Sequence, residues 1–249
     1  MIREIIKHAD GPSVAVAVAN DFIKYVGNLL ASKPAAHVSL TGGTVGILSL
    51  VKLAEHPDVL TLDWSRVHIW WGDERFVAAN SKDRNALQAR EALLNKLPLN
   101  PANVHEFPAF HESESESVSA QLDAAAESFA SEVASVFAAN GGAPMFDLTL
   151  LGMGPDGHIA SLFPGHQLPA AGLSIIAEHN SPKPPPQRLS FTYEAINNST
   201  EIWLVVAGAD KAEAASVAFS DAPTRLPVGR VHALGKTVWY LDQTAGEGI

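Results

Sequence analysis

Short apolar runs alternate with helix-length segments through most of this chain. The segment Ser13 to Leu30 has its apolar residues at helical spacing, and further helices are expected at 45–55, 84–95, 118–139 and 210–219. Strand-like apolar runs lie at 36–40, 67–71, 146–151, 173–177, 202–207 and 236–241. This alternation is typical of a largely parallel sheet with helices on both faces and right-handed connections. The sequence therefore predicts an α/β fold of three layers, α/β/α, with a mostly parallel, Rossmann-like sheet.

The size and composition of the chain fit one domain. With 249 residues, 47% hydrophobic and 18% charged, residues 1–249 can bury a substantial single core. The absence of cysteine excludes disulfides, a thiolate nucleophile and a cysteine-bound metal. The N-terminus carries charged residues, and the apolar stretch Val14 to Ala19 is shorter than a membrane span, so we expect a cytoplasmic protein.

The net charge limits the class of partner. A formal charge of −10 argues against nucleic acid or an anionic membrane, because such partners select basic surfaces. A phosphorylated substrate would also meet overall repulsion, so its site must concentrate the few basic residues. The basic residues that lie in or near a few loop segments are Arg75, Arg84, Lys183, Arg188 and Lys211.

A glycine-rich turn follows the strand-like run Phe146 to Leu151 and carries Asp156 and His158, two residues apart. Open α/β sheets place active sites at the carboxyl ends of their strands, where loops and helix starts supply polar groups beside a crevice. A titratable imidazole at this position indicates chemistry. Taken alone, such a turn would more often be only a tight connection.

Two further strand ends carry polar motifs. Residues 40–44, Leu-Thr-Gly-Gly-Thr, join a strand to a helix start, where glycines and unpaired N–H groups suit an anion such as phosphate. The motif lacks the Gly-Lys-Ser/Thr of a P-loop and the full dinucleotide fingerprint. Residues 67–75 are an apolar strand that ends in Gly-Asp-Glu-Arg.

These motifs, together with the proline-rich segment 181–190 and Gly-Ala-Asp-Lys at 208–211, follow one another in the order of a known family. The chain resembles the glucosamine/galactosamine-6-phosphate isomerase family, which contains the 6-phosphogluconolactonases and the glucosamine-6-phosphate deaminases. The resemblance runs from the first glycine turn to the last strand. It implies hydrolysis of 6-phospho-D-glucono-1,5-lactone to 6-phospho-D-gluconate in the oxidative pentose phosphate pathway.

The resemblance also implies catalytic roles. His158 is the expected general base, because an imidazole suits deprotonation of water and later protonation of the leaving oxygen. Asp156 would orient this imidazole or, alternatively, serve only its own Asx turn. Asp73 and Arg75 form a second cluster, with Arg75 on phosphate or the developing oxyanion and Asp73 on a sugar hydroxyl. Ser161 is not an expected nucleophile, because it does not stand in a Gly-x-Ser-x-Gly motif.

The phosphate group would meet backbone donors and cations. The resemblance implies contacts from Gly42, Gly43, Thr44, Arg188 and Lys211, and Arg84 is a further candidate that could instead begin a solvated helix. The histidines are scattered and no carboxylates cluster in the sequence, so we expect no metal and no cofactor. We expect a monomer or a small homo-oligomer that takes a small phosphorylated sugar lactone.

Two other functions remain as alternatives. The deaminases continue Asp-Gly-His-Ile-Ala with Phe-Asn-Glu, whereas this chain has Ser-Leu-Phe at 161–163, so the glutamate for ring opening is missing. A noncatalytic sugar-phosphate sensor would keep its phosphate ligands and lose its base, whereas Asp73, Asp156 and His158 are all present. Both comparisons favour the lactonase.

Overall fold

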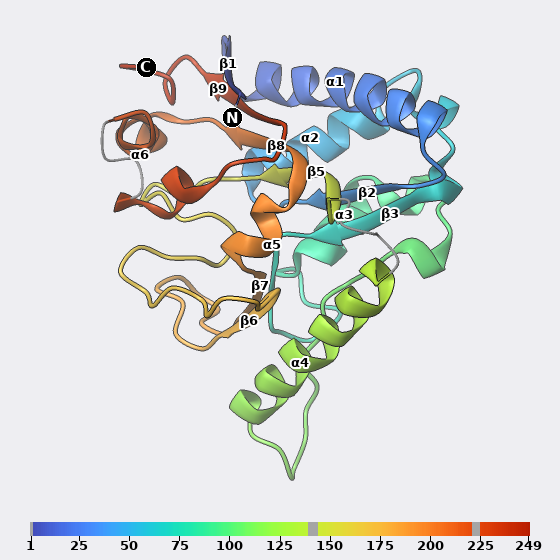
Figure 1. The fold of residues 1–249 in the computed structure, drawn as a ribbon, viewed down its shortest axis with the longest axis vertical. Coiled ribbons are helices and arrows are strands. Elements are labelled where there is room, and N and C mark those ends of the chain that lie inside the picture. The colour runs from blue at the N-terminus through green and yellow to red at the C-terminus, as the bar shows by residue number, and fades with distance from the viewer. Residues whose placement is uncertain (1, 139–143, 221–224) are drawn as a thin grey trace.

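A six-stranded parallel sheet forms the centre of the molecule (Figure 1). The computed structural model describes residues 2–138, 144–220 and 225–249. Within these residues the strands of this sheet are β1 (Ile2–His8), β2 (Ala36–Leu40), β3 (Val67–Trp71), β5 (Phe146–Leu151), β8 (Ser199–Val206) and β9 (Lys236–Asp242). Their order is β1-β9-β8-β5-β2-β3, and every neighbouring pair is parallel. The α/β fold class predicted from the sequence is confirmed.

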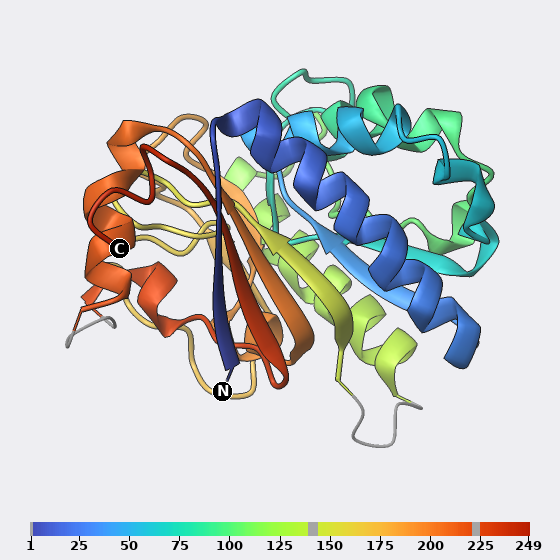
Figure 2. The same cartoon turned by 90° about the horizontal axis from the view of Figure 1, so that it is seen from above.

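Helices flank the sheet. They are α1 (Gly11–Ser32), α2 (Thr44–Ala54), α3 (Asn85–Ala92), α4 (Val118–Phe137), α5 (Tyr193–Asn197) and α6 (Ala212–Ala218). Helices α1 and α2 pack against each other on one side of the strands, and α6 lies on the opposite side (Figure 2). In Figure 1, α1 runs along the top of the molecule and α4 along the bottom, and β2, β3, β5 and β8 lie between them.

Several predicted helices differ at their ends. The helix expected at 84–95 stops at Ala92 and is followed by a separate 3-10 turn, Leu94–Lys96. The helix expected at 210–219 begins with a 3-10 turn, Ala209–Lys211, before α6. The helix expected at 118–139 ends at Phe137, and residue 139 lies outside the described residues.

A second, smaller sheet forms where the sequence predicts mostly loops. Its strands are β4 (Asp73–Arg75), β6 (Ile175–Glu178) and β7 (Arg188–Phe191), antiparallel in the order β4-β7-β6. The run 173–177 was expected in the parallel sheet, and this expectation is wrong. Residues 179–187 connect β6 to β7, and a parallel pairing would need a longer crossover.

Helix α1 is long and apolar enough to cross a membrane when judged by length and composition alone. It exceeds the stretch Val14 to Ala19 considered in the sequence, because the helix continues to Ser32. Its apolar face packs against the rest of the domain, because Val18, Phe22 and Val26 are buried and α1 contacts α2 and β9. Core helices of α/β domains carry such an apolar face.

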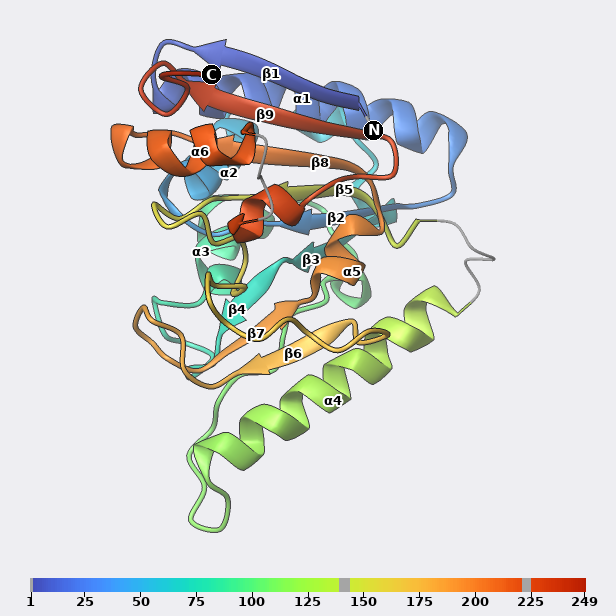
Figure 3. The same ribbon diagram turned by 60° about the vertical axis from the view of Figure 1, so that its left-hand side comes forward.

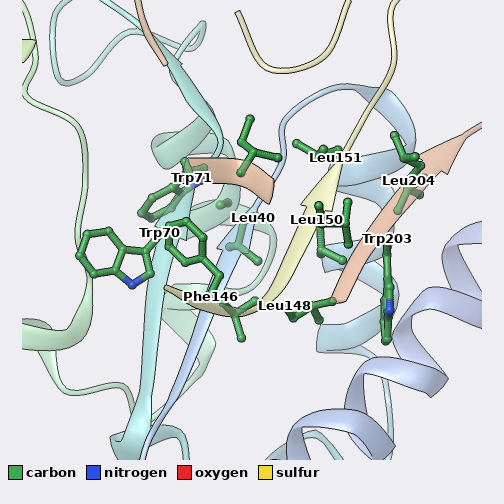
Figure 4. Close-up of a cluster of buried hydrophobic side chains, with 14 of the residues drawn as sticks. Leu40, Trp70, Trp71, Phe146, Leu148, Leu150, Leu151, Trp203 and Leu204 are labelled. Atoms are coloured by element: carbon green, nitrogen blue, oxygen red, sulfur yellow. The ribbon is translucent and has the colours of Figure 1, made fainter. Parts of the chain in front are cut away.

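The middle of the parallel sheet carries the hydrophobic core (Figure 4). Leu40, Trp71 and Leu150 are buried, and strands covered on both faces contain such continuous apolar runs. The core continues into the small sheet, because the rings of Phe146 and Phe191 lie with their centroids 5.1 Å apart. At the carboxyl end of β3, the backbone N–H of Phe191 donates to the Gly72 carbonyl at 3.0 Å and attaches the small sheet there.

Candidate active site

A cavity of about 470 Å³ lies where the loops after β2, β5 and β8 meet the small sheet. The carboxyl ends of parallel strands share one edge of a sheet, so loops distant in sequence come together there. The predicted site residues that line this cavity are Gly42, Gly43, Thr44, Asp73, Arg75, His158, Arg188 and Lys211. Asp156 lies beside His158, and Arg84 lies outside the cavity.

His158 and Asp156 form the closest polar contact at this site. Asp156 Oδ1 lies 2.5 Å from His158 Nδ1 and 3.4 Å from the backbone N of His158. The carboxylate therefore contacts the ring and also closes an Asx-type turn, so the two roles considered for Asp156 are geometrically compatible. Gly154 is required here, because a Cβ at this position would stand 2.0 Å from His158 Nδ1.

The surroundings of the pair favour a neutral imidazole beside an ionised carboxylate. Burial lowers the pKa of His158 below its usual value of 6.5, against the opposing effect of the hydrogen bond and charge of Asp156. Burial raises the pKa of Asp156, but contacts with His158 and the charge of Lys183 outweigh it, so that pKa is lowered. A neutral, partly buried imidazole is the form that can accept a proton.

Asp73 lies at the centre of a buried hydrogen-bond network. The Ser161 hydroxyl donates to Asp73 Oδ2 at 2.6 Å, and Arg188 Nη1 lies 3.8 Å from the same oxygen. The side-chain amide of Asn85 donates to the backbone oxygen of Asp73 at 2.9 Å. The network joins the loop of His158 to the small sheet and fixes the Asp73 carboxylate at the cavity wall.

The glycine turn after β2 delivers the start of α2 to the cavity. Gly43 is the N-cap residue and has φ +80°, a conformation that glycine adopts without strain. Within the described part of the chain no side chain caps this helix start. The first backbone N–H groups of a helix have no partner within the helix, so they are available to an anion.

Three predicted cations line the cavity, and each is held by the protein. Arg75 Nη1 donates to the backbone oxygen of Asp83 at 2.7 Å. Lys211 Nζ donates to Asp210 Oδ2 at 2.8 Å. Arg188 is almost fully buried, and its guanidinium donates to three backbone carbonyls of the loop before β7. Together they place positive charge around the cavity in a chain whose net charge is negative.

Arg84, a further phosphate candidate from the sequence, does not line the cavity. Arg84 is 2% exposed, its Nη2 donates to the backbone oxygen of Phe107 at 2.7 Å, and the same nitrogen lies 3.7 Å from Glu74 Oε2. Glu74 in turn accepts from the backbone N–H groups that begin α3. Burial raises the pKa of Glu74, and Arg84 opposes this rise. Arg84 therefore neutralises a buried carboxylate, which draws it into the interior.

Two further residues line the site: Lys183, one of the basic residues that the sequence places near it, and Asn85, which was not predicted. Lys183 lines the cavity with its Nζ 3.7 Å from Asp156 Oδ1. Its place in the proline-rich segment 181–190 indicates a rigid loop near the site. Asn85 also lines the cavity, with its Oδ1 packed so closely on Gly42 that a Cβ there would lie 2.1 Å away. Only its place after the Gly-Asp-Glu-Arg strand could have indicated Asn85.

Comparison with known proteins identifies the family of the chain. A family model described as glucosamine-6-phosphate isomerases/6-phosphogluconolactonase matches residues 9–239. The 6-phosphogluconolactonase of Streptomyces coelicolor is 40% identical over 250 residues, covering 99% of this chain and 94% of that protein. The crystal structure of 6-phosphogluconolactonase from Thermotoga maritima has a TM-score of 0.79 at 28% identity, covering 97% of this chain and 100% of that one.

The deaminase branch is similar in fold. A monomeric glucosamine-6-phosphate deaminase has a TM-score of 0.76 at 17% identity, covering 97% of this chain and 98% of that one. This level of identity shows a shared fold only. The family model and the relative at 40% identity both extend over nearly the whole chain, and the chain belongs to the family of glucosamine-6-phosphate isomerases and 6-phosphogluconolactonases.

Proposed function

We propose that the protein hydrolyses 6-phospho-D-glucono-1,5-lactone to 6-phospho-D-gluconate, a step of the oxidative pentose phosphate pathway. The observation that carries the proposal is the His158–Asp156 pair in a cavity that also contains the start of α2 and Lys211. A base beside an anion site suits a phosphorylated ester. The similarity to the Streptomyces coelicolor 6-phosphogluconolactonase supports the same assignment.

His158 acts as base and then as acid in this mechanism. Its Nδ1 is engaged by Asp156, so Nε2 is the nitrogen that takes a proton from water. The water oxygen bonds to the lactone carbonyl carbon and forms a tetrahedral oxyanion. Collapse of this intermediate breaks the bond to the ring oxygen, which receives the proton from Nε2. The carboxylic acid product then ionises, and the neutral imidazole is restored.

The cations and the glycine turn have separate tasks. Gly42, Gly43 and Thr44 offer backbone and hydroxyl donors to the phosphate group, and Lys211 adds a point charge. Arg188 contributes charge from the cavity wall. Arg75 would stabilise the oxyanion or the phosphate, and Asp73 would accept a hydrogen bond from a sugar hydroxyl. These contacts hold the lactone so that its carbonyl faces His158.

A coupled assay tests the activity. The lactone is generated freshly by enzymatic oxidation of glucose 6-phosphate, and formation of 6-phosphogluconate is followed with a dehydrogenase. The purified protein should accelerate hydrolysis well above the spontaneous rate. Ammonia release from glucosamine 6-phosphate is measured in parallel and should be negligible. Deaminase turnover comparable to lactone hydrolysis would move the assignment to that branch.

The reaction is expected to be independent of metal. Among residues 2–138, 144–220 and 225–249, no group of three or more His, Asp or Glu side chains is arranged to hold a metal ion. Turnover should therefore be the same with and without EDTA. Loss of most activity in EDTA, with recovery on adding one divalent ion, would contradict the mechanism.

The alternative of a noncatalytic sensor is distinguished by the same assay. A sensor would bind 6-phosphogluconate without accelerating lactone hydrolysis. Binding in calorimetry, together with a hydrolysis rate no higher than the spontaneous rate, would therefore favour a sensor. The cytoplasmic location, the oligomeric state and the absence of nucleic-acid or membrane partners stay predictions from the sequence.

A further inference from the structure

Lys183 lies on the cavity wall next to the proposed catalytic pair. Its Nζ is 3.7 Å from Asp156 Oδ1, and the same oxygen lies 2.5 Å from His158 Nδ1. An ammonium and an imidazole therefore share one carboxylate oxygen. Because the side chain of Lys183 is 40% exposed, the ammonium has solvent as an alternative to this position.

The backbone that carries Lys183 is held from the interior by Arg188. Arg188 Nη2 donates to the carbonyls of Lys183 and Pro184 at 3.1 and 3.2 Å, and its Nε donates to Pro185 at 3.1 Å. The hydroxyl of Ser181 adds a hydrogen bond to the Lys183 carbonyl at 2.9 Å. A fixed backbone lowers the entropy cost of keeping a long side chain at one place.

We propose that Lys183 is a positioning residue for the Asp156–His158 pair and that Arg188 holds Lys183 in its place. The roles of His158 as base and of Asp156 as orienting group rest on the proposed lactonase function. An ammonium beside Asp156 stabilises the carboxylate that orients the ring and disfavours a second positive charge on the imidazole. The neutral ring, which accepts the proton from water, is thereby favoured.

The charged groups that face the imidazole are Asp156, Lys183 and Asp73. Burial is the largest influence and lowers the pKa of His158, and Lys183 lowers it further, whereas Asp156 and Asp73 raise it. Removing the charge of Lys183 should therefore raise this pKa. The acid limb of the pH profile should move to higher pH, because the base would be protonated over a wider range.

The experiment compares Lys183→Met with Lys183→Arg. Met keeps most of the length and removes the charge, and Arg keeps the charge. The titration midpoint of His158 is measured by NMR, with its imidazole signal identified among the 10 histidines by its absence in His158→Asn. The acid limb of kcat/KM is measured in parallel. Both midpoints should rise by about 0.2–0.7 pH unit in Lys183→Met and stay near wild type in Lys183→Arg.

The matched control is Lys24→Met. Lys24 lies on α1, away from the cavity, and forms an ion pair of 3.6 Å with Asp21, close to the length of the Lys183–Asp156 pair. Lys24→Met changes the net charge by the same amount as Lys183→Met. Because Lys24 lies away from His158, the titration midpoint of His158 should not move in this variant. Lys183→Gln serves as a second uncharged variant if Lys183→Met folds poorly.

Three results would overturn the proposal. The first is a His158 midpoint in Lys183→Met that equals wild type or moves equally in Lys24→Met. The second is a raised KM with an unmoved midpoint, which would make Lys183 a phosphate contact. The third is a loss of plateau kcat of about 100-fold with an unmoved midpoint, which would place Lys183 on the reacting atoms. The NMR titration needs no turnover, so a shifted midpoint in a protein without lactonase activity would contradict the function and leave the positioning role standing.

Discussion

The two ring nitrogens of His158 have different surroundings. Nδ1 is committed to Asp156 at 2.5 Å, and the ring packs beside Phe163 with centroids 4.8 Å apart. The ring also lines the cavity. A ring that is oriented on one side and faces the cavity has the geometry that a general base requires.

Replacing His158 with Asn tests this role directly. Asn keeps part of the size and polarity but has no usable pKa, so kcat should fall by about 10²–10⁴-fold while the protein stays folded. The wild-type rate should decline as pH falls through the imidazole pKa, which burial holds below 6.5. This decline should be missing from the residual activity of the variant.

The control for His158→Asn is binding of 6-phosphogluconate, measured by calorimetry. It should persist, because the glycine turn and Lys211 are unchanged. A folded variant with near-normal turnover would contradict the mechanism even if the lactonase activity were real.

Lys211 lines the cavity and is proposed to bind the phosphate group. A fixed phosphate contact interacts similarly with substrate and transition state, so Lys211→Ala should raise KM by one to two orders of magnitude and change kcat much less. The estimate follows from about 1.5–3 kcal/mol for a charge-assisted hydrogen bond. Saturation curves of the variant measure it, and an unchanged KM would mean that phosphate is held elsewhere.

At the scale of elements, α3 depends on a buried ion pair. Glu74 accepts from the backbone N–H groups of Asn85 and Ala86 at 2.7 and 2.9 Å, and Arg84 neutralises it. These contacts attach the start of α3 to β4. The orientation of Asn85 against Gly42 and Asp73 follows from this attachment.

Arg84→Met should therefore reduce stability. Removing one partner leaves Glu74 buried without its counter-charge, which typically costs about 3–5 kcal/mol. Urea unfolding measures the loss. The KM of the folded variant should stay close to wild type, whereas a 10-fold or larger rise with unchanged stability would restore the predicted phosphate contact.

The strands predicted well from the sequence are those with continuous apolar runs. The expected runs 36–40, 67–71 and 146–151 coincide with β2, β3 and β5, because strands covered on both faces are continuously apolar. The strands β1, β4 and β7 carry charged or polar residues, and their pairing depends on distant partners. No local pattern reveals such strands.

The same distinction applies to the site. The contact of Asp156 with His158 follows from their spacing of two residues, so the sequence could predict it. The side chain of Arg84 is buried because it pairs with the buried Glu74, ten positions earlier in the chain. The hydrogen bonds of Arg188 to the proline-rich loop depend on how β7 pairs with β6. Residue type alone does not tell which way a cation points.

The amino ends of β2 and β3 hold a histidine cluster, composed of His37, His68 and His105, away from the active site. His37 and His68 stack with centroids 4.4 Å apart, and His68 Nδ1 lies 3.0 Å from His105 Nε2. Trp70 Nε1 donates to His37 Nδ1 at 3.3 Å. The histidines also face Lys33 and Asp147, which form an ion pair. Burial and His68 lower the pKa of His37 to about 4.

This cluster should make stability depend on pH. Between pH 6.5 and about 4 the unfolded chain binds a proton at His37 that the folded chain does not, so stability should fall as pH falls through this window. The contribution of His37 to the free energy of unfolding is about 3 kcal/mol at most. His37→Gln should flatten the slope of the free energy of unfolding between pH 4 and 6.5, and an unchanged slope would show that His37 titrates alike in the folded and the unfolded chain.

At the scale of the whole molecule, the two sheets share one hydrophobic core. Ile175, Leu189 and Phe191 of the small sheet belong to the same buried cluster as Phe146 and Trp70 of the parallel sheet. Residues 1–249 are therefore predicted to unfold as a single domain. Calorimetry should show one transition with equal calorimetric and van't Hoff enthalpies. Two resolved transitions, or a small sheet lost first, would contradict this.

The pairing of β1 with β9 (Figure 3) has a consequence for biosynthesis. Ile2 lies opposite Lys236 and His8 opposite Asp242, and among the described residues β1 pairs with no strand of the sheet other than β9. On the ribosome, β1 emerges long before β9, because the two strands lie far apart in the sequence. Until β9 has been synthesised, β1 and the edge of β8 that β9 covers are expected to be surfaces for chaperone capture or for aggregation with a neighbouring nascent chain.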